Sequence, residues 1–286
     1  MELGLRAASS TSLNGSARLE GGVRSVPIIG PSGTEVPASV AESGSGRPIV
    51  FLHGLVGLND HWEGVDQTIS KHARCMMLQI PLLDLRGPDC SIGGVTELTI
   101  KFLEERVGEP AMLVGNSFGG HVALRIALER PDLVYGLVLA GSSGLIEKSM
   151  VKEVQLRPSR DWLSDKIGEL FFDRSVMRDE DLDRAHKELS ERGCARAMVR
   201  LSRTARRNHL GDRITQITTP TLLVWGKDDV VTPPAAADEF LRLLPDVRIV
   251  WFDRCGHVPM MEHPDLFAQA VIGFIDELQQ ADRAAS

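Results

Sequence analysis

Residues 111–120 have the sequence AMLVGNSFGG, in which an apolar run passes directly into the pattern Gly-x-Ser-x-Gly. The apolar residues predict a buried strand, and residues 118–130 predict a helix that ends before Pro131. A serine on a sharp turn between strand and helix is exposed at the sheet edge, beside a helix N-terminus that favours developing negative charge. The stretch therefore predicts Ser117 as a nucleophile, against the alternative of an incidental serine in a glycine-rich turn.

Further apolar runs on both sides of this stretch alternate with helical patterns. The other strand candidates are residues 48–52, 75–80, 133–140, 221–225 and 248–252. The other helix candidates are residues 97–107, 235–244 and 264–280, and residues 23–29 are a further strand candidate in a hairpin with residues 36–40. Nearly continuous hydrophobicity suits strands that are buried on both faces. We therefore expect an α/β fold with a mostly parallel central sheet flanked by helices.

The alternation of strands and helices is interrupted between residues 146 and 218. Amphipathic, charge-rich helical segments replace the apolar runs there, and a strand pattern returns at residue 221. We expect a helical cap, or lid, at residues 146–218, inserted into an α/β core made of residues 23–145 and 219–286. Residues 1–22, which are rich in Ser, Ala and Gly, are expected to be a flexible tail.

Composition narrows the class of protein. The chain of 286 residues has 32 basic and 39 acidic residues, and its net charge of −7 gives no support to nucleic-acid binding. It contains no apolar run long enough to span a bilayer, and its first residues hold no apolar block of signal-peptide length. Its four cysteines show neither metal-site nor C-x-x-C spacing. We expect a cytoplasmic, reduced protein, a monomer or homodimer, with a small-molecule substrate and no nucleic-acid or membrane partner.

A serine hydroxyl becomes a strong nucleophile only when a base takes its proton and an acid orients the base. Candidates for both follow Ser117 along the chain. Residues 225–233 (WGKDDVVTP) place two adjacent acids, Asp228 and Asp229, after a strand. Residues 255–259 (CGHVP) place His257 on the loop between the last strand and the last helix. The order of serine, acid and histidine predicts a catalytic triad.

Acyl transfer also needs hydrogen-bond donors for the negatively charged oxygen of the intermediate. We expect these to be the backbone N–H of Phe118, directly after the nucleophile, and that of Leu55, in the loop HGLVG after the first buried strand. Gly54 permits close approach of this loop, and His53 is expected to hold it by side-chain hydrogen bonds. Other polar residues near these motifs are assigned packing, supporting or structural roles: Asn116, His121, His61 and His263.

Four motifs occur along the chain in the order HG-x-x-G, G-N-S-F-G-G, W-G-x-x-D-x-x-x-P and C-G-H-x-P. Their order and spacing resemble the α/β-hydrolase superfamily over residues 48–278, interrupted by the expected cap. The resemblance implies that the acid is Asp229, three residues after the glycine of its motif, and that Asp228 is a solvated turn residue. Haloalkane dehalogenases and epoxide hydrolases of this fold carry an aspartate where Ser117 stands, so we exclude those activities.

The G-N-S-F-G-G motif is similar to that of meta-cleavage product hydrolases, which split carbon–carbon bonds. Those relatives carry a tryptophan after the catalytic histidine, where this chain has Val258, and a Gly/Pro-rich oxyanion loop, where it has HGLVGLNDHW. Both differences favour a carboxylesterase-like hydrolase of small esters, which needs no metal or cofactor. The alternatives are carbon–carbon cleavage of a vinylogous diketone acid and, from another class, a non-catalytic small-ligand receptor on the same fold.

The expected cap carries an arginine stripe and apolar residues. Five arginines are spaced for one face of a helix: Arg192, Arg196, Arg200, Arg203 and Arg207. A solvated cap face, with its charges meeting the acids of residues 179–191, is favoured over steering of an anionic substrate or docking of an acidic partner. The residues expected to line an apolar substrate pocket are Leu145, Leu170, Phe171, Phe172 and Val258. Met198 and Leu201 are expected to pack the cap on the core.

Overall fold

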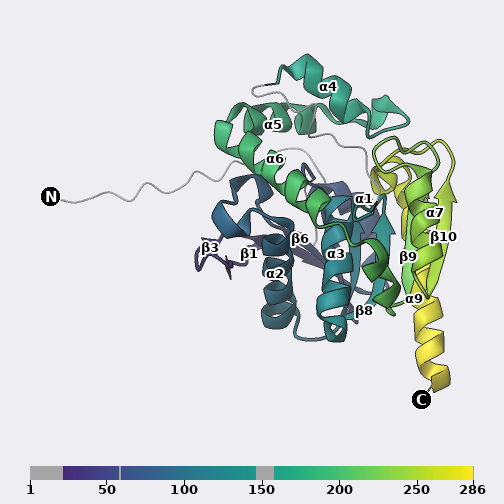
Figure 1. The fold of residues 1–286 in the computed structure, drawn as a ribbon. Helices are drawn as coiled ribbons and strands as arrows, with labels where there is room; N and C mark the ends of the chain where they lie inside the picture. The colour runs from purple at the N-terminus through teal and green to yellow at the C-terminus, as the bar shows by residue number, and fades with distance from the viewer. Residues whose placement is uncertain (1–21, 58, 146–157, 286) are drawn as a thin grey trace.

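The structure is a computed structural model that describes residues 22–57, 59–145 and 158–285. An eight-stranded sheet runs through its centre in the order β1-β4-β6-β5-β7-β8-β9-β10 (Figure 1). The strands are β1 (Val23–Ser25), β4 (Ser39–Ser43), β5 (Pro48–Leu52), β6 (Arg74–Gln79), β7 (Ala111–Asn116), β8 (Val134–Ala140), β9 (Thr221–Gly226) and β10 (Val247–Phe252). β4 pairs antiparallel with β1 and β6, and the other neighbours pair parallel. The mostly parallel sheet predicted from the sequence is therefore present.

The N-terminal strands form the hairpin that was expected there. β1 pairs with β4, in register from Val23 with Ala41 to Ser25 with Ser39. Between them, the short strands β2 (Ile28–Ile29) and β3 (Glu35–Val36) pair with each other, and Gly33 in the connecting turn has a φ of 77°. The hairpin adds an antiparallel edge to the parallel sheet.

The two faces of the sheet are covered by different helices, because successive side chains of a strand point to opposite sides. In β5, Val50 and Leu52 belong to one apolar cluster, whereas Ile49 and Phe51 belong to the other. The first cluster includes side chains of α2 (Ile92–Phe102), α3 (Phe118–Glu129) and α7 (Pro234–Leu243), and the second includes those of α1 (Glu63–Ile69) and α9 (Pro264–Ala285). None of the helices in the described residues combines the length and apolar character needed to cross a membrane.

Helix α2 differs from the helix predicted over residues 97–107. It begins earlier, at Ile92, because Ser91 Oγ caps its first turn by accepting a hydrogen bond from Gly94 N at 3.0 Å. The last predicted residues, Leu103–Val107, form a π-helical turn that ends at Gly108, whose φ is 75°. Adjacent glycines at positions 93 and 94 are poor helix formers and interrupt the apolar pattern, so the sequence did not reveal the first turn.

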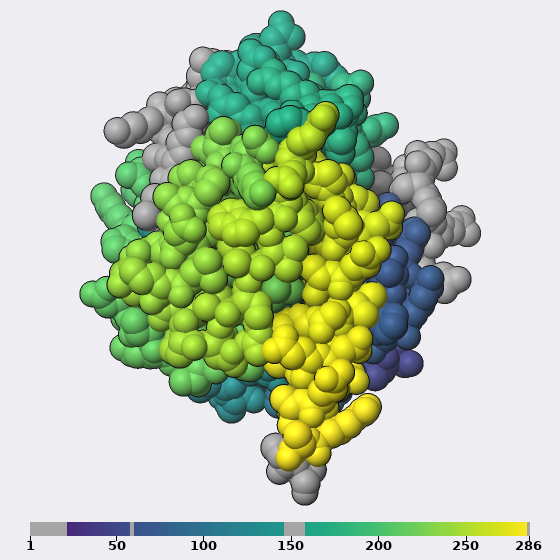
Figure 2. Space-filling view, turned by 90° about the vertical axis from the view of Figure 1, so that its right-hand side faces the viewer, coloured from purple at the N-terminus to yellow at the C-terminus, as the bar shows by residue number. Residues whose placement is uncertain are grey.

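In the described residues, the α-helices between β8 and β9 are α4 (Arg160–Gly168), α5 (Asp179–Ser190) and α6 (Arg192–Arg207), and α4 and α5 lie above the sheet in Figure 1. We call them the helical insertion. Leu163, Leu182 and Met198 join them in one apolar cluster, and Leu201 of α6 is buried in the core cluster, as expected. Figure 2 shows the teal α4 segment resting on the yellow C-terminal segments. The first part of the predicted cap, residues 146–157, lies outside the described residues.

The five arginines of the predicted stripe lie on the solvent side of α6. All five side chains are exposed, whereas Ala195, Met198, Leu201 and Ala205 are buried on the opposite side of the helix. The arginine stripe therefore forms a solvent-exposed face of α6, as expected. The expected pairing with the acids of residues 179–191 is wrong for the described chain. Four of those acids, Asp179, Asp181, Asp183 and Glu188, pair instead with Arg160, Arg178 and Arg184.

Candidate active site

The predicted nucleophile lies on a strained turn between β7 and α3. Ser117 has φ 54° and ψ −116°, a conformation that non-glycine residues rarely adopt. The turn closes because its neighbours lack side chains. A Cβ on Gly115 would lie 2.5 Å from Gly120 N, and a Cβ on Gly119 would lie 2.2 Å from Leu52 O. The turn therefore holds Ser117 at the carboxyl end of β7 and at the N-terminus of α3.

The structure brings His257 and Asp229 together in a buried pair. His257 Nδ1 lies 2.9 Å from Asp229 Oδ2, and the two side chains are almost fully excluded from solvent. Asp229 Oδ1 accepts hydrogen bonds from Val231 N at 2.8 Å and Thr232 N at 2.9 Å. A carboxylate held in this way can fix the tautomer and orientation of the imidazole. Ser117 and His257 line the same cavity, although no hydrogen bond joins their side chains in the described structure.

The two adjacent acids of the WGKDD motif have different surroundings. Asp229 is buried against His257, whereas Asp228 is exposed and accepts a hydrogen bond from Cys255 N at 3.3 Å.

Thr232 is a further residue of the site that the sequence analysis does not name. Its hydroxyl lies 2.8 Å from Asp229 Oδ2 and 2.9 Å from Gly141 O, so it links the carboxylate to the end of β8. Its place in the same motif, three residues after Asp229, was the signal for this role.

The loop that carries His257 is held from three directions. His257 N donates to Leu170 O at 2.7 Å, and Asn116 Nδ2 donates to His257 O at 3.0 Å. Glu262, in the short helix α8 (Pro259–Glu262), accepts hydrogen bonds from Gly256 N at 2.6 Å and from Phe172 N at 2.8 Å. Glu262 therefore joins the histidine loop to the helical insertion, and the sequence carried no signal for this contact.

The loop after β5 also lies close to the nucleophile. A Cβ on Gly54 would lie 3.6 Å from Ser117 Cβ, so the backbone of this loop is close to the reacting group. His53 Nδ1 lies 2.7 Å from Gly54 O, and its Nε2 lies 3.3 Å from Gln79 Nε2. Burial lowers the pKa of His53 to about 4, so the ring is neutral near pH 7 and holds the loop, as expected.

The two expected oxyanion donors come from segments that both lie near Ser117. Phe118 is the first residue of α3, so its N–H has no partner one turn earlier in the helix. Leu55 lies on the wall of the cavity that Ser117 also lines. This arrangement is suited to binding a negatively charged oxygen beside the serine.

A cavity of about 140 Å³ lies between the helical insertion and the sheet. Leu170, Phe171 and Val258 are on its wall, in the places expected from the sequence. The expectation is wrong for the other two residues. Leu145 packs against the core cluster, and Phe172 is 43% exposed, with the Arg254 guanidinium 5.4 Å from its ring centre. The chain turns at residue 172, whose N–H bonds to Glu262, so successive side chains there point in different directions.

Two residues that were given structural roles also line the cavity. Met198, expected to pack the insertion on the core, contributes to the wall as well as to the apolar cluster of the insertion. His61, from the segment after β5, lies on the same wall. His263, by contrast, is partly exposed and packs edge-on against Phe252, away from the cavity. The positions of Met198 and His61 on the wall were not predictable from the sequence, because the wall is built from segments that are distant in the chain.

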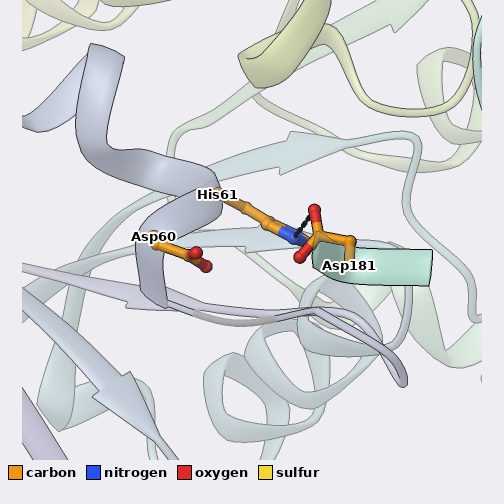
Figure 3. A group of neighbouring side chains, drawn as sticks. All are labelled: Asp60, His61 and Asp181. Carbon is orange, nitrogen blue, oxygen red and sulfur yellow. Dashed lines mark hydrogen bonds and ion pairs between the residues drawn. The ribbon is translucent and has the colours of Figure 1, made fainter. Parts of the chain in front are cut away.

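Asp60, His61 and Asp181 form a cluster whose oxygen and nitrogen atoms lie within 4.8 Å of one another (Figure 3). Such a group has the right atom types for a metal ion. However, Arg178 donates to Asp60 Oδ2 at 3.0 Å and to Asp181 Oδ2 at 2.8 Å, so a guanidinium already bridges the two carboxylates. The donor set therefore fits an ion-pair network better than a metal site.

Comparison with known proteins places the chain among hydrolases. It is 28% identical to pimeloyl-[acyl-carrier protein] methyl ester esterase of Nitrosomonas europaea, over 80% of this chain and 95% of the relative. It is 27% identical to 2-hydroxy-6-oxo-6-(2'-aminophenyl)hexa-2,4-dienoic acid hydrolase of Metapseudomonas resinovorans, over 86% of this chain and 89% of the relative. A solved alpha/beta hydrolase from a sediment metagenome of the Mar Chica lagoon, Morocco, has a TM-score of 0.69 and 31% identity, over 84% of this chain and 95% of that one.

The family match covers the whole site. Residues 49–270 match the Alpha/beta hydrolase family, and this range includes the serine turn, the buried His–Asp pair and the loop after β5. The mostly parallel sheet carries these features at the ends of its strands, where the family pattern requires them. This chain belongs to the alpha/beta hydrolase family.

Proposed function

We propose that this protein is a serine hydrolase that cleaves a small carboxylic ester through an acyl-enzyme. The observation that carries the proposal is the convergence of Ser117, on its strained turn, and the buried His257–Asp229 pair on one cavity. The helical insertion roofs this cavity, and we propose that it acts as the cap of the active site. The chemistry requires only these side chains and two backbone N–H groups.

The proposed reaction has two steps. His257 takes the proton of Ser117, whose oxygen attacks the ester carbonyl, and the N–H groups of Phe118 and Leu55 stabilise the oxyanion. His257 then protonates the departing alcohol. In the second step His257 removes a proton from water, the hydroxide attacks the acyl-enzyme, and the acid leaves as Ser117 regains its proton. Asp229 holds the imidazole and stabilises its positive charge in both steps.

Ester hydrolysis is favoured over carbon–carbon cleavage by the composition of the wall. Val258, directly after the histidine, contributes an aliphatic side chain to the cavity where meta-cleavage product hydrolases carry an indole. The name of the Nitrosomonas relative supports an ester substrate, whereas the name of the Metapseudomonas relative supports the second candidate, cleavage of a vinylogous diketone acid.

We expect purified protein to hydrolyse p-nitrophenyl butyrate with a kcat/KM at least about tenfold higher than that for a meta-cleavage ring-fission product. A fluorophosphonate probe should label Ser117, which intact-mass and peptide analysis would locate. Faster turnover of the ring-fission product would favour the carbon–carbon hydrolase instead. If the protein shows no turnover of either substrate and no labelling by the probe, the hydrolase proposal is contradicted. That result would support a non-catalytic receptor on this fold.

Exchanging Arg196 and Arg203 for glutamine should change kcat/KM by less than about twofold, equally for neutral and anionic esters. The reason is that both side chains are exposed on the solvent face of α6, whereas Met198 and Ser202 of this helix line the cavity. The measurement is steady-state kinetics at low and high salt, with exposed Arg206 changed to glutamine as the matched control. A loss confined to anionic esters at low salt would show that the stripe steers substrates.

A further inference from the structure

The ionisable side chains on the described part of the cavity wall, besides His257, are His61, Lys166, Asp181 and Arg184. Each is already engaged by a protein group of opposite charge or by a hydrogen-bond partner. Lys166 Nζ, on α4, lies 2.9 Å from Oε1 of Glu169, the residue that follows this helix. The other three belong to one network centred on Asp181 of α5.

Asp181 receives hydrogen bonds from three directions. His61 Nε2 lies 3.1 Å from its Oδ2 (Figure 3), Arg178 Nε lies 2.8 Å from the same oxygen, and Arg184 Nη2 lies 3.3 Å from its Oδ1. Burial by itself would raise the pKa of Asp181, but the bonds from His61 and Arg178 lower it well below its usual range. Asp181 is therefore a carboxylate at neutral pH, and it lies on the wall of the cavity.

The cations of this network are balanced by nearby anions. Arg178 also pairs with Asp60 at 3.0 Å, and Arg184 also pairs with Glu188 at 3.6 Å. The two guanidinium groups thus face the carboxylates of Asp60, Asp181 and Glu188. The network carries no net positive charge even when His61 is protonated. A substrate carboxylate placed here would meet Asp181 and find no unpaired cation, and desolvating a charge without a partner is costly.

Most of the other residues on the described wall are apolar, and Asn116 and Ser202 are the polar ones besides the reacting Ser117. The apolar residues include Trp162, Leu163, Ile167, Met177, Leu189 and Met261, contributed mainly by the helical insertion. Such a wall stabilises alkyl or aryl groups, because it removes their apolar surface from water. The polar network therefore closes one part of an apolar cavity without offering a site for an anion.

We propose that this cavity selects neutral esters with an apolar acyl chain and disfavours esters whose acyl chain ends in a carboxylate, with Asp181 as the residue that determines this specificity. The inference rests on the proposed function, since it assigns a substrate class to the same site. It makes Arg184 a structural partner of Asp181 and Glu188 rather than a binding group for a substrate acid.

The test compares three p-nitrophenyl esters: the hexanoate, the adipate half-ester with a terminal carboxylate, and its neutral terminal-amide counterpart. The wild-type kcat/KM for the carboxylate ester should be at least about tenfold lower than for the amide ester, which has nearly the same size. The hexanoate separates the effect of charge from that of polarity. Equal or faster cleavage of the carboxylate ester would overturn the proposal. Labelling of Ser117 by a fluorophosphonate is unaffected by that outcome, so failure of the specificity and failure of the hydrolase assignment are distinguishable.

Two substitutions should move the ratio of carboxylate to amide kcat/KM in opposite directions. Asp181→Asn removes the repelling charge and leaves Arg184 partly unpaired, so the ratio should rise by about tenfold. Arg184→Gln leaves the wall more negative, so the ratio should fall further. Asp179→Asn is the matched control, because it removes the same charge from an 82% exposed side chain of α5 that pairs with Arg160. Thermal unfolding checks that each variant is folded. A folded Asp181→Asn protein with an unchanged ratio, or a fall in both variants, would overturn the proposal.

Discussion

Replacing Ser117 with alanine should lower kcat for p-nitrophenyl butyrate by roughly a million-fold, the loss seen when a catalytic serine acting with its base is removed. The proposed mechanism has no other group that can form the acyl-enzyme, and the buried His257–Asp229 pair has no function in nucleophilic attack without the serine oxygen. Alanine and serine have the same backbone restrictions at the φ of 54°, so the thermal unfolding midpoint should change little.

The measurement is burst and steady-state kinetics together with fluorophosphonate labelling, which should disappear in the variant. Ser202→Ala is the matched control, since Ser202 lines the same cavity and has no part in the proposed chemistry. Its kcat should stay within about tenfold of the wild-type value. Retention of wild-type activity by the Ser117→Ala protein would move the nucleophile elsewhere in the chain.

Asp229→Asn should lower kcat by about ten-thousand-fold, whereas Asp228→Asn should lower it by less than about threefold. Asp229 accepts hydrogen bonds from two backbone N–H groups through Oδ1 and faces His257 Nδ1 through Oδ2. If the amide oxygen keeps the backbone bonds, the amide N–H₂ must face His257 and favours the wrong tautomer of the imidazole. Asp228 is exposed, and an asparagine oxygen there can still accept the hydrogen bond from Cys255 N, so the substitution removes mainly a surface charge.

This pair of neighbouring substitutions is internally controlled, because both remove one carboxylate from the same turn. Circular dichroism and thermal unfolding should separate loss of chemistry from loss of structure in the buried variant. Similar losses in both variants, or a larger loss in Asp228→Asn, would show that the orienting acid has been assigned to the wrong residue.

Much of the fold could be predicted from the sequence, because the patterns that indicate strands and turns lie within short stretches of the chain. The strands of the parallel sheet are short, nearly continuous apolar runs, and each predicted strand lies within a residue or two of an observed one. Ser117 was identified by the glycines around it, and those glycines are needed because any Cβ at positions 115 or 119 would overlap the backbone. The start of α2 was missed because its first turn contains two glycines and is stabilised by Ser91 rather than by an apolar pattern.

The sequence by itself determined the sheet, the strained serine turn, and the order in which serine, aspartate and histidine follow one another. Only the tertiary structure decided which atoms meet. Glu262 and Leu170 hold the loop of His257 through contacts that no sequence pattern indicated. The cavity wall was equally unpredictable, since His61 and Asp181 meet across 120 residues of chain. Periodicity reports which side of its own helix or strand a residue occupies. The packing of the whole domain decides which distant segment of the chain that side contacts. For this reason Phe172 is exposed, whereas Met198 and His61 line the cavity.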